Sequence, residues 1–120
     1  MCNLVRYKNS KLVADIKLPY IINISKQAEK AKNISRIMLF GSSIEERCTE
    51  ESDIDIAVFG KKTRGRYIDS KEFADFKYNL FCFDWDQDYD VLYFKEDNKS
   101  QAFIMQDINN GVEIFRRATE

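Results

Sequence analysis

Hydrophobic residues recur along this chain at helical spacing in some segments and at strand spacing in others. Apolar residues every three or four positions predict helices, and short apolar or alternating runs bounded by polar residues or glycine predict strands. The expected elements are a helix over about 20–33, a strand over 36–40, a loop or short helix over 43–52, a strand over 53–59, a helix over 73–83, a strand over 90–94, a helix over 100–109 and a short strand over 112–115. Strands separated by helices favour a layered α/β fold.

The same pattern predicts how some elements start and which side chains face the core. Asp69 and Glu72 resemble a capping box with Asp in place of Ser, which would start the helix that follows. The residues expected to face inward are Phe73, Phe76, Leu80 and Phe83 in that helix, and Phe103, Ile104 and Ile108 in the last one. Residues 1–19 give no clear pattern, although Leu12-Val13-Ala14 suits a short strand or a turn of helix.

The composition is that of one globular domain with balanced charge. The chain has 120 residues, of which 44% are apolar, with 19 Lys and Arg against 20 Asp and Glu. It contains no histidine. A Ser-His-Asp triad, a Cys-His pair and a histidine-containing zinc site are therefore excluded for this chain alone, and proton transfer falls to carboxylates, Lys, Tyr, Cys or water. The balanced charge also gives no sign of a globally basic surface for nucleic acid.

The cysteines and the short apolar runs indicate a soluble protein of the cytoplasm, not of a membrane. The chain has an odd number of cysteines, Cys2, Cys48 and Cys82, which lie far apart and form no C-x-x-C pair. This pattern is typical of reduced thiols. Cys48 lies among polar residues, which favours an exposed side chain. No apolar run exceeds four residues, whereas a membrane-spanning helix needs roughly 20 and a signal-peptide core roughly 7–15.

Three polar features lie at the ends of predicted strands. Gly41-Ser42 follows a buried strand, and a turn of this kind offers backbone N–H groups and a hydroxyl to phosphate oxygens. Asp53 and Asp55 begin the next strand and, two residues apart, point to the same face. Two carboxylates on one face of an apolar strand favour a divalent cation between them. Asp90 opens a third strand and can reach its neighbour's carboxylates.

Each feature also has a purely structural interpretation. Gly-Ser at a strand end is commonly an ordinary turn. Asp53 can cap a turn while Asp55 lies at an exposed edge, and Asp90 can be a solvated strand end. The basic segment 61–66 can contact phosphates or an acidic partner, or form a solvated loop.

Together these residues resemble a known family of enzymes. Leu39-Phe40-Gly41-Ser42, the string Ser52-Asp53-Ile54-Asp55-Ile56 and the distant Asp90 are similar to the hallmark of the nucleotidyltransferases of the DNA polymerase β superfamily. The likeness is closest to the small stand-alone minimal nucleotidyltransferases (MNT) and covers roughly residues 20–117. It implies that residues 1–120 form a single nucleotidyltransferase domain, with 1–19 as a poorly defined N-terminal segment. The implied fold is α/β (α+β), a small mixed β-sheet with helices packed on it.

The resemblance also implies the chemistry. The expected site residues are Asp53, Asp55 and Asp90 for catalysis and for holding two Mg²⁺ ions, and Gly41, Ser42 and Ser43 for binding the nucleotide. A nucleoside monophosphate, AMP in the active relatives, would move from a triphosphate such as ATP to a hydroxyl, with Asp90 taking the acceptor's proton. Because stand-alone members of this size are often antitoxins paired with HEPN-domain ribonucleases, the expected acceptor is a hydroxyl on a HEPN-type toxin.

The chain departs from the family pattern just after Gly-Ser. The family commonly has a small residue and a second glycine where this chain has Ile44, Glu45 and Glu46. The two added carboxylates disfavour a triphosphate, and Arg47 offsets part of their charge. Three alternatives stay open. They are a silent MNT domain that neutralises a toxin by binding alone, a small-molecule nucleotidyltransferase completed by homo-oligomerisation, and a carboxylate-rich metal-binding domain without transferase activity.

Overall fold

A four-stranded mixed sheet forms the centre of the molecule, and a separate two-stranded hairpin lies beside it. The computed structural model describes residues 2–7, 11–97 and 103–118. The strands are β1 Leu4–Tyr7, β2 Lys11–Ala14, β3 Ile34–Phe40, β4 Ile54–Gly60, β5 Tyr89–Lys95 and β6 Val112–Arg116. The helices are α1 Leu18–Lys30, α2 Arg64–Tyr67, α3 Lys71–Phe83 and α4 Phe103–Asn109, with short 3-10 turns η1 Asp15–Lys17 and η2 Gly41–Ile44. The α/β (α+β) class is confirmed, as are the predicted helices and strands from residue 20 onward within the described residues. The loop expected over the basic segment 61–66 is wrong in part, because Arg64–Tyr67 forms the short helix α2.

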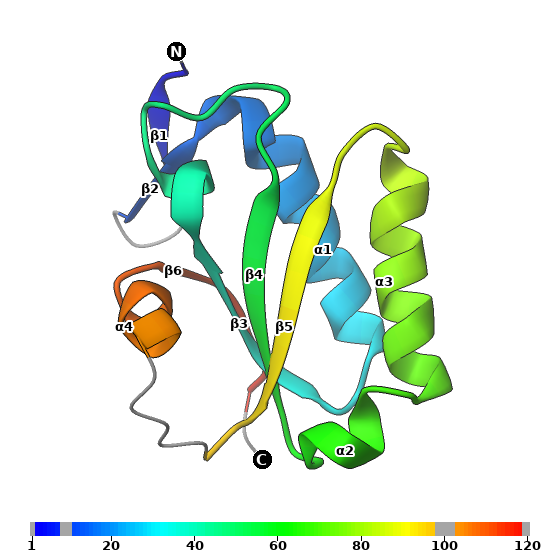
Figure 1. The fold of residues 1–120 in the computed structure, drawn as a ribbon. Coiled ribbons are helices and arrows are strands. Elements are labelled where there is room, and N and C mark those ends of the chain that lie inside the picture. The colour runs from blue at the N-terminus through cyan, green and yellow to red at the C-terminus, as the bar shows by residue number, and fades with distance from the viewer. Residues whose placement is uncertain (1, 8–10, 98–102, 119–120) are drawn as a thin grey trace.

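The strand order positions the acidic residues. The order in the central sheet is β5-β4-β3-β6, with β3 antiparallel to β4 and β6, and β4 parallel to β5 (Figure 1). A parallel pair needs a crossover, and α2 and α3 supply it here. Because β4 and β5 are parallel and adjacent, their first residues lie at the same end of the sheet. Both predicted acidic motifs are at those first residues.

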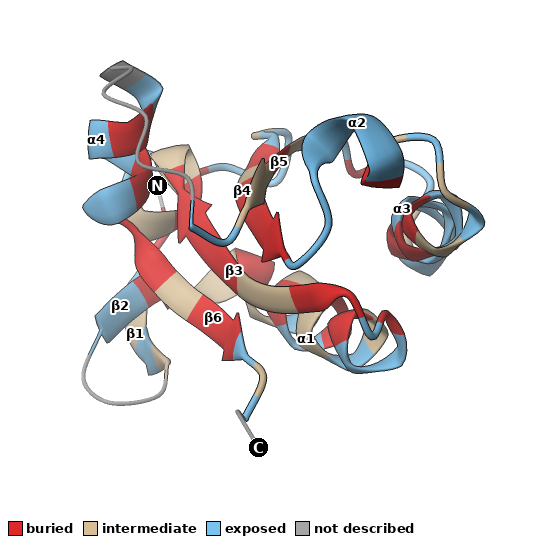
Figure 2. Cartoon of the chain, turned by 90° about the horizontal axis from the view of Figure 1, so that it is seen from below, coloured by how far each residue is buried: buried red, intermediate tan, exposed pale blue. Residues whose placement is uncertain are grey.

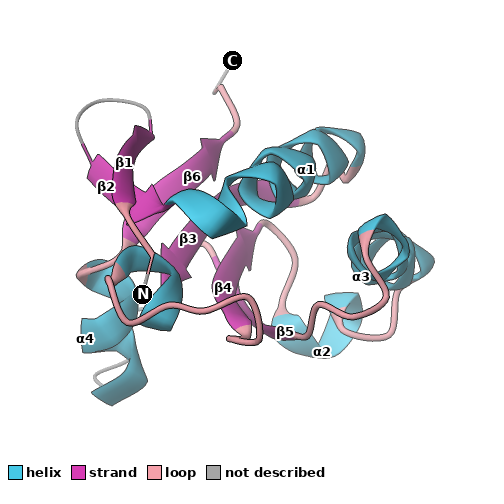
Figure 3. Ribbon diagram, turned by 90° about the horizontal axis from the view of Figure 1, so that it is seen from above, coloured by secondary structure: helices cyan, strands magenta, loops and turns pink. Residues whose placement is uncertain are grey.

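Helices cover both faces of the sheet, α1 and α3 on one and α4 on the other (Figure 3). The larger core lies under α1 and α3, where Ile24 and Phe76 pack with alternate residues of the strands, including Ile37, Leu39 and Ile56. A smaller core lies under α4 and contains Met38, Phe40, Ala57, Phe59, Met105 and Ile108. In the ranges described here, no helix is long and apolar enough to cross a membrane.

The described residues of the N-terminal segment, 2–7 and 11–19, form regular structure that their sequence pattern does not predict. β1 and β2 pair antiparallel, and Val13 is fully buried in the main core. The backbone N–H of Cys2 donates to the carbonyl of Glu46, so the start of the chain is fixed to the loop after η2. The exposed position expected for Cys48 is wrong, because this residue is buried with Cys2 and Ala14. Burial raises the pKa of the Cys48 thiol.

Three details of the predicted helices need correction. The capping box is wrong: Ser70 is the N-cap of α3, and its hydroxyl accepts from the N–H of Phe73. Phe83 is 48% exposed, because the helix ends there. Ile104 is 38% exposed and Met105 is buried in its place, so the inward face of α4 is rotated by one residue. Phe76, Leu80 and Ile108 are buried as predicted. The side chain of Phe103 lies outside the described part of the structure.

Candidate active site

Strand alternation places Asp55 and Asp90 on the same face of the sheet. In β4, Ile54 and Ile56 face the core under α1 and α3, so Asp55 points to the face that α4 covers. Asp55 and Asp90 are directly opposite each other in the register of β4 and β5. Adjacent strands lie about 4.8 Å apart, so the two carboxylates are immediate neighbours.

These carboxylates and Asp53 repel one another. Burial raises the pKa of Asp55, and the charges of Asp90 and then Asp53 raise it further. Asp53 and Asp90 are exposed and Asp55 is half-buried, so the cluster opens to solvent. Within the described ranges, none of the three carboxylates has a hydrogen bond or an ion pair. The structure therefore sets Asp55 opposite Asp90 and brings Asp53 close enough for its charge to act on Asp55, and a cation beside this pair would relieve the repulsion.

The Gly41-Ser42 turn lies against Asp55. Phe40 is paired with Asp55 in the sheet, and Gly41 follows in the left-handed region at φ 73°. A Cβ atom at position 41 would overlap Oδ2 of Asp55, so only glycine allows this approach. Ser42 is half-buried in η2, and Ser43 is fully buried with no hydrogen-bond partner for its Oγ in the described residues. The turn that the sequence predicts for phosphate binding is thus next to the carboxylates.

Of the residues that depart from the family pattern, the two glutamates lie at the surface, whereas Ile44 is half-buried and packs against the main core. Glu45, Glu46 and Arg47 are exposed, and Nη2 of Arg47 contacts Oε1 of Glu45 at 2.9 Å. An exposed ion pair of this kind contributes little to stability. Arg47 also lowers the pKa of Asp55 slightly, against the larger effects that raise it. Arg47 therefore offsets part of the added negative charge, as expected, and it does so mainly through its ion pair with Glu45.

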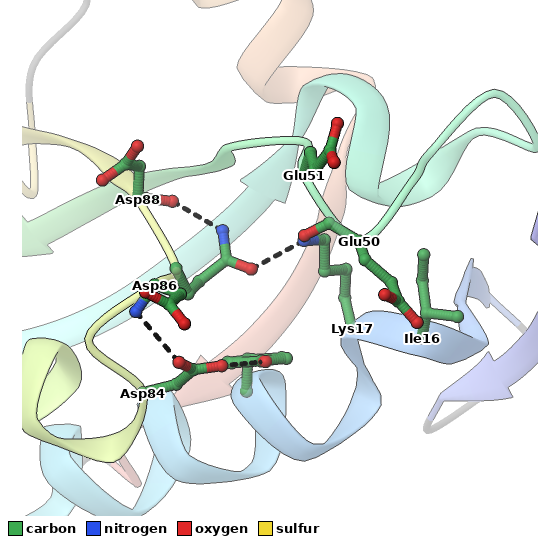
Figure 4. A pocket seen from close by; sticks show the side chains of 9 residues that line it. Ile16, Lys17, Glu50, Glu51, Asp84, Asp86 and Asp88 are labelled. Atoms are coloured by element: carbon green, nitrogen blue, oxygen red, sulfur yellow. Dashed lines mark hydrogen bonds between the residues drawn. The ribbon is translucent and has the colours of Figure 1, made fainter.

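A buried lysine that the sequence interpretation missed fixes the segment before Asp53. Lys17 is 1% exposed at the start of α1. Its Nζ donates to the carbonyls of Glu50 at 3.1 Å and Ser52 at 2.8 Å. It also donates to Oε1 of Gln87 at 2.6 Å (Figure 4). Burial lowers the pKa of Lys17. A lone lysine near a helix start carries no sequence signal for this role, because its partners are 33 to 70 residues away.

Gln87 extends the same network to the segment before Asp90. The Gln87 side chain is buried, and its Nε2 donates to the carbonyls of Ser52 at 3.0 Å and Asp88 at 2.7 Å. The N–H of Ile54 also donates to the carbonyl of Asp88 at 3.0 Å. Lys17 and Gln87 together, here called the Lys17–Gln87 clamp, therefore fix the two chain segments that present Asp53 and Asp90.

The predicted basic segment 61–66 lies away from this site. It follows Gly60 at the far end of β4, and Arg64 begins α2 there. The seven residues of β4 separate it from Asp53, a distance of about 23 Å at about 3.3 Å per residue. Of its two functional interpretations, contact with the same phosphates is therefore excluded by distance.

The donor set fits Mg²⁺ shared with a substrate. Among the described residues, no group of three or more acidic or thiol side chains could by itself hold a metal ion. Mg²⁺ does not require such a group, because it commonly binds to one or two carboxylates, to waters and to substrate phosphates. Asp55, which is half-buried and destabilised by neighbouring negative charge, supplies the kind of hard oxygen ligand that Mg²⁺ prefers.

A mixed sheet with carboxylates at the start of a parallel strand pair, beside a Gly-Ser turn, is the arrangement of a nucleotidyltransferase domain. The sequence matches the family described as "Polymerase beta, Nucleotidyltransferase" over residues 22–120. The chain therefore belongs to the polymerase beta nucleotidyltransferase family.

Comparison with individual proteins adds little to the family assignment. Among solved structures, the chain is similar to a candidate nucleotidyltransferase from Sulfolobus solfataricus, with 20% identity and a TM-score of 0.40. The match covers 87% of this chain and 90% of the other. No curated protein sequence matches this chain.

Proposed function

We propose that this protein transfers a nucleoside monophosphate from a nucleoside triphosphate to a hydroxyl on a partner protein. The observation that carries the proposal is the pairing of Asp55 with Asp90 across β4 and β5, beside Asp53 and the Gly41 turn. Burial and the charges of Asp90 and Asp53 disfavour the ionised form of Asp55, and family members use such a cluster for nucleotide transfer. Membership of the family supports the reaction class.

Each residue of the site has a distinct role in this proposal. Asp53, Asp55 and Asp90 would hold two Mg²⁺ ions, which would neutralise the triphosphate and make the acceptor hydroxyl more acidic. Asp90 is exposed at the cluster, so it can also receive the proton of the acceptor hydroxyl. The Gly41, Ser42 and Ser43 turn would orient the β- and γ-phosphates.

The transfer itself conserves charge and atoms. The acceptor oxygen forms a bond to the α-phosphorus, and the bond from that phosphorus to the oxygen that bridges to the β-phosphate breaks. Pyrophosphate leaves opposite the attacking oxygen. The absence of histidine from the chain is consistent with this chemistry, because the proton passes to a carboxylate.

We propose ATP as the donor and a HEPN-type toxin as the acceptor protein, on the basis of the resemblance to stand-alone MNT proteins. This places the protein in the cytoplasm as an antitoxin that modifies its toxin. A second candidate is toxin binding without catalysis. Glu45 and Glu46 favour it, because they add negative charge to the loop after η2, close to a triphosphate site.

The test is incorporation of label from α-³²P-ATP with Mg²⁺ present. Asp55→Asn keeps the shape of the side chain and removes its charge, and Asp69→Asn is a matched control at an exposed position near α3. Wild-type protein and Asp69→Asn should label a protein band in cell extract, and Asp55→Asn should lose at least about 10³-fold of the rate. Label on a small molecule would contradict the protein acceptor. Toxin neutralisation that survives both Asp53→Ala and Asp55→Ala would favour binding alone.

A further inference from the structure

The outer face of α3 and the turn after it carry aromatic side chains that the fold leaves uncovered. Phe73, Phe76 and Leu80 bury the inner face of this helix. Tyr78 and Phe81 lie three residues apart on the outer face and are 61% and 39% exposed. Trp85, which is 63% exposed, lies in the turn after the helix ends at Phe83. These three residues are here called the aromatic stripe. Figure 2 shows the contrast between the buried inner side and the exposed outer side of α3. Large aromatic side chains on the solvent face of a helix commonly mark a binding surface.

The aromatic stripe is pre-ordered. The rings of Phe81 and Trp85 pack edge to face with centroids 4.7 Å apart. Aromatic anchors that are already packed lose little conformational entropy on binding, and Trp and Tyr are enriched among the residues that dominate interface energies. At the other end of the same helix face, Lys71 and Asp75 form an exposed ion pair, so the apolar surface is confined to the C-terminal half of α3.

An acidic pocket adjoins the aromatic stripe. Trp85 lies between Asp84 and Asp86, and both of these line a cavity of about 800 Å³ (Figure 4). Glu50, Glu51 and Asp88 contribute three more carboxylates to this lining. The pocket's own cation, Lys17, is buried and bonded to two backbone carbonyls and Gln87. The pocket therefore presents negative charge to solvent, and two of its carboxylates, Asp84 and Asp86, are the sequence neighbours of the exposed Trp85.

We propose that the aromatic stripe and the acidic pocket form one docking surface for a partner protein that presents a basic amphipathic helix. The apolar face of that helix would cover Tyr78, Phe81 and Trp85, and its Lys or Arg side chains would enter the acidic pocket. Charge complementarity identifies this occupant. A second copy of the chain in a symmetric dimer would bring the same carboxylates towards each other, and a head-to-tail contact with its basic segment would form a ring or an open-ended polymer.

The position of the pocket connects this surface to the proposed reaction. Glu50 and Glu51 precede Asp53 by a few residues, and Asp88 precedes Asp90 by two. A protein docked there would lie beside the chain segments that lead into Asp53 and Asp90, and Asp90 would accept the proton of its hydroxyl. This connection rests on the proposed function, whereas the docking surface itself does not.

Trp85 is the sole tryptophan, so its fluorescence reports docking directly and without nucleotide. The probes are three synthetic helical peptides with the same leucine pattern and with Lys, Glu or Gln at the polar positions. We expect the Lys peptide to shift Trp85 emission to shorter wavelength and to bind at least tenfold more tightly than the Glu peptide at low salt, with weaker binding as salt is added. Asp55→Asn should bind the Lys peptide unchanged, which separates this test from the test of catalysis.

A paired substitution localises the binding. Tyr78→Ser with Phe81→Ser should weaken binding of the Lys peptide at least tenfold, and Asn79→Ser, on the same helix outside the aromatic stripe, should leave it unchanged. Circular dichroism checks that both variants fold. Equal affinity for the Lys and Glu peptides, or no emission shift with any peptide, would overturn the proposal. A blue shift that grows with protein concentration without peptide would also overturn it, because it would indicate self-association.

Discussion

Two groups of polar side chains at opposite ends of the central sheet differ in whether they have hydrogen-bond partners. At the end where β3 begins and β4 ends, Asn33 donates to the Tyr93 hydroxyl at 2.9 Å and accepts from the N–H of Lys62 at 2.8 Å. Tyr93 in turn donates to the carbonyl of Lys62, and Glu72 accepts from the N–H of Asn33. We call this group the amide network. Each of these polar atoms has a partner, as expected for groups that serve folding.

At the opposite end, Asp53, Asp55 and Asp90 form a carboxylate cluster without such partners in the described ranges. The pKa of Asp55 is raised by burial and by its neighbours' charges. The buried Oγ of Ser43 also lacks a partner there. Since both ends belong to the same strands, the difference does not come from the fold as a whole. The amide network is satisfied within the protein, whereas the carboxylate cluster is the part that we propose a cation completes.

The largest expected effect on stability is at the amide network. Asn33→Ala removes partners from the Tyr93 hydroxyl and from the N–H of Lys62, and the cost is about 3 kcal/mol of unfolding free energy. Urea denaturation measures this loss. The exposed Asn79→Ala is the matched control and should change stability by less than about 0.5 kcal/mol. If Asn33→Ala were as stable as the control, the amide network would not be a stabilising feature.

A smaller loss is expected for the Lys17–Gln87 clamp. Lys17→Met keeps a long apolar stem and leaves the carbonyls of Glu50 and Ser52 without their donor, at a cost of roughly 2 kcal/mol. Because the clamp fixes the segments that carry Asp53 and Asp90, affinity for Mn²⁺ should also fall. Lys26→Met, at an exposed position of α1, is the control. Unchanged Mn²⁺ affinity in Lys17→Met would show that the clamp does not position the carboxylates.

Asp55→Asn should increase stability, by about 1 kcal/mol at neutral pH, because it removes a repelled charge. The pKa of Asp55 is raised above its ordinary value of 3.8 on folding, so the native state binds the proton more tightly than the unfolded chain. As pH rises from about 3.8 through the raised native pKa, ionisation of Asp55 lowers the free energy of unfolding of the wild type. Above the native pKa this loss reaches its full value. Below pH 3.8 the wild type and the variant should converge. Thermal denaturation across this pH range measures the difference in stability. If Asp55→Asn were no more stable than the wild type at neutral pH, the account would be contradicted.

The smallest expected effect is at Ser43. Because its buried Oγ makes no hydrogen bond in the described residues, Ser43→Ala should change the unfolding free energy by less than about 0.5 kcal/mol. Ser35→Ala provides a comparison, since the Ser35 hydroxyl donates to the carbonyl of Phe59 at 3.1 Å. A clear loss of stability for Ser43→Ala in urea denaturation would mean that the hydroxyl is satisfied in solution.

Local sequence pattern predicted the parts of the molecule that depend on neighbouring residues. The apolar runs that became β3, β4 and β5 and the face shared by Asp53 and Asp55 follow from strand periodicity alone. The start of α3 was misassigned because Glu72 lies three residues after Asp69, as in a capping box. Glu72 instead accepts from the N–H of Asn33 and the hydroxyl of Tyr67, two contacts that depend on tertiary packing.

Distant pairings could not be predicted from one sequence. The register that sets Asp55 opposite Asp90 joins strands 35 residues apart along the chain. The Lys17–Gln87 hydrogen bond spans 70 residues. Cys48 seemed exposed among its polar neighbours, but the N-terminal segment covers it. In each case the contacting residue is distant in the sequence, and local periodicity carries no information about such contacts.

Titration of Mn²⁺ in the presence of a non-hydrolysable ATP analogue tests the central claim most directly, because it measures whether the carboxylate cluster is completed by a cation. We expect the wild type to bind Mn²⁺ and Asp55→Asn to bind it at least tenfold more weakly, with Asp69→Asn matching the wild type. Electron paramagnetic resonance of free Mn²⁺ gives these affinities. Equal affinity of Asp55→Asn and the wild type would contradict the account.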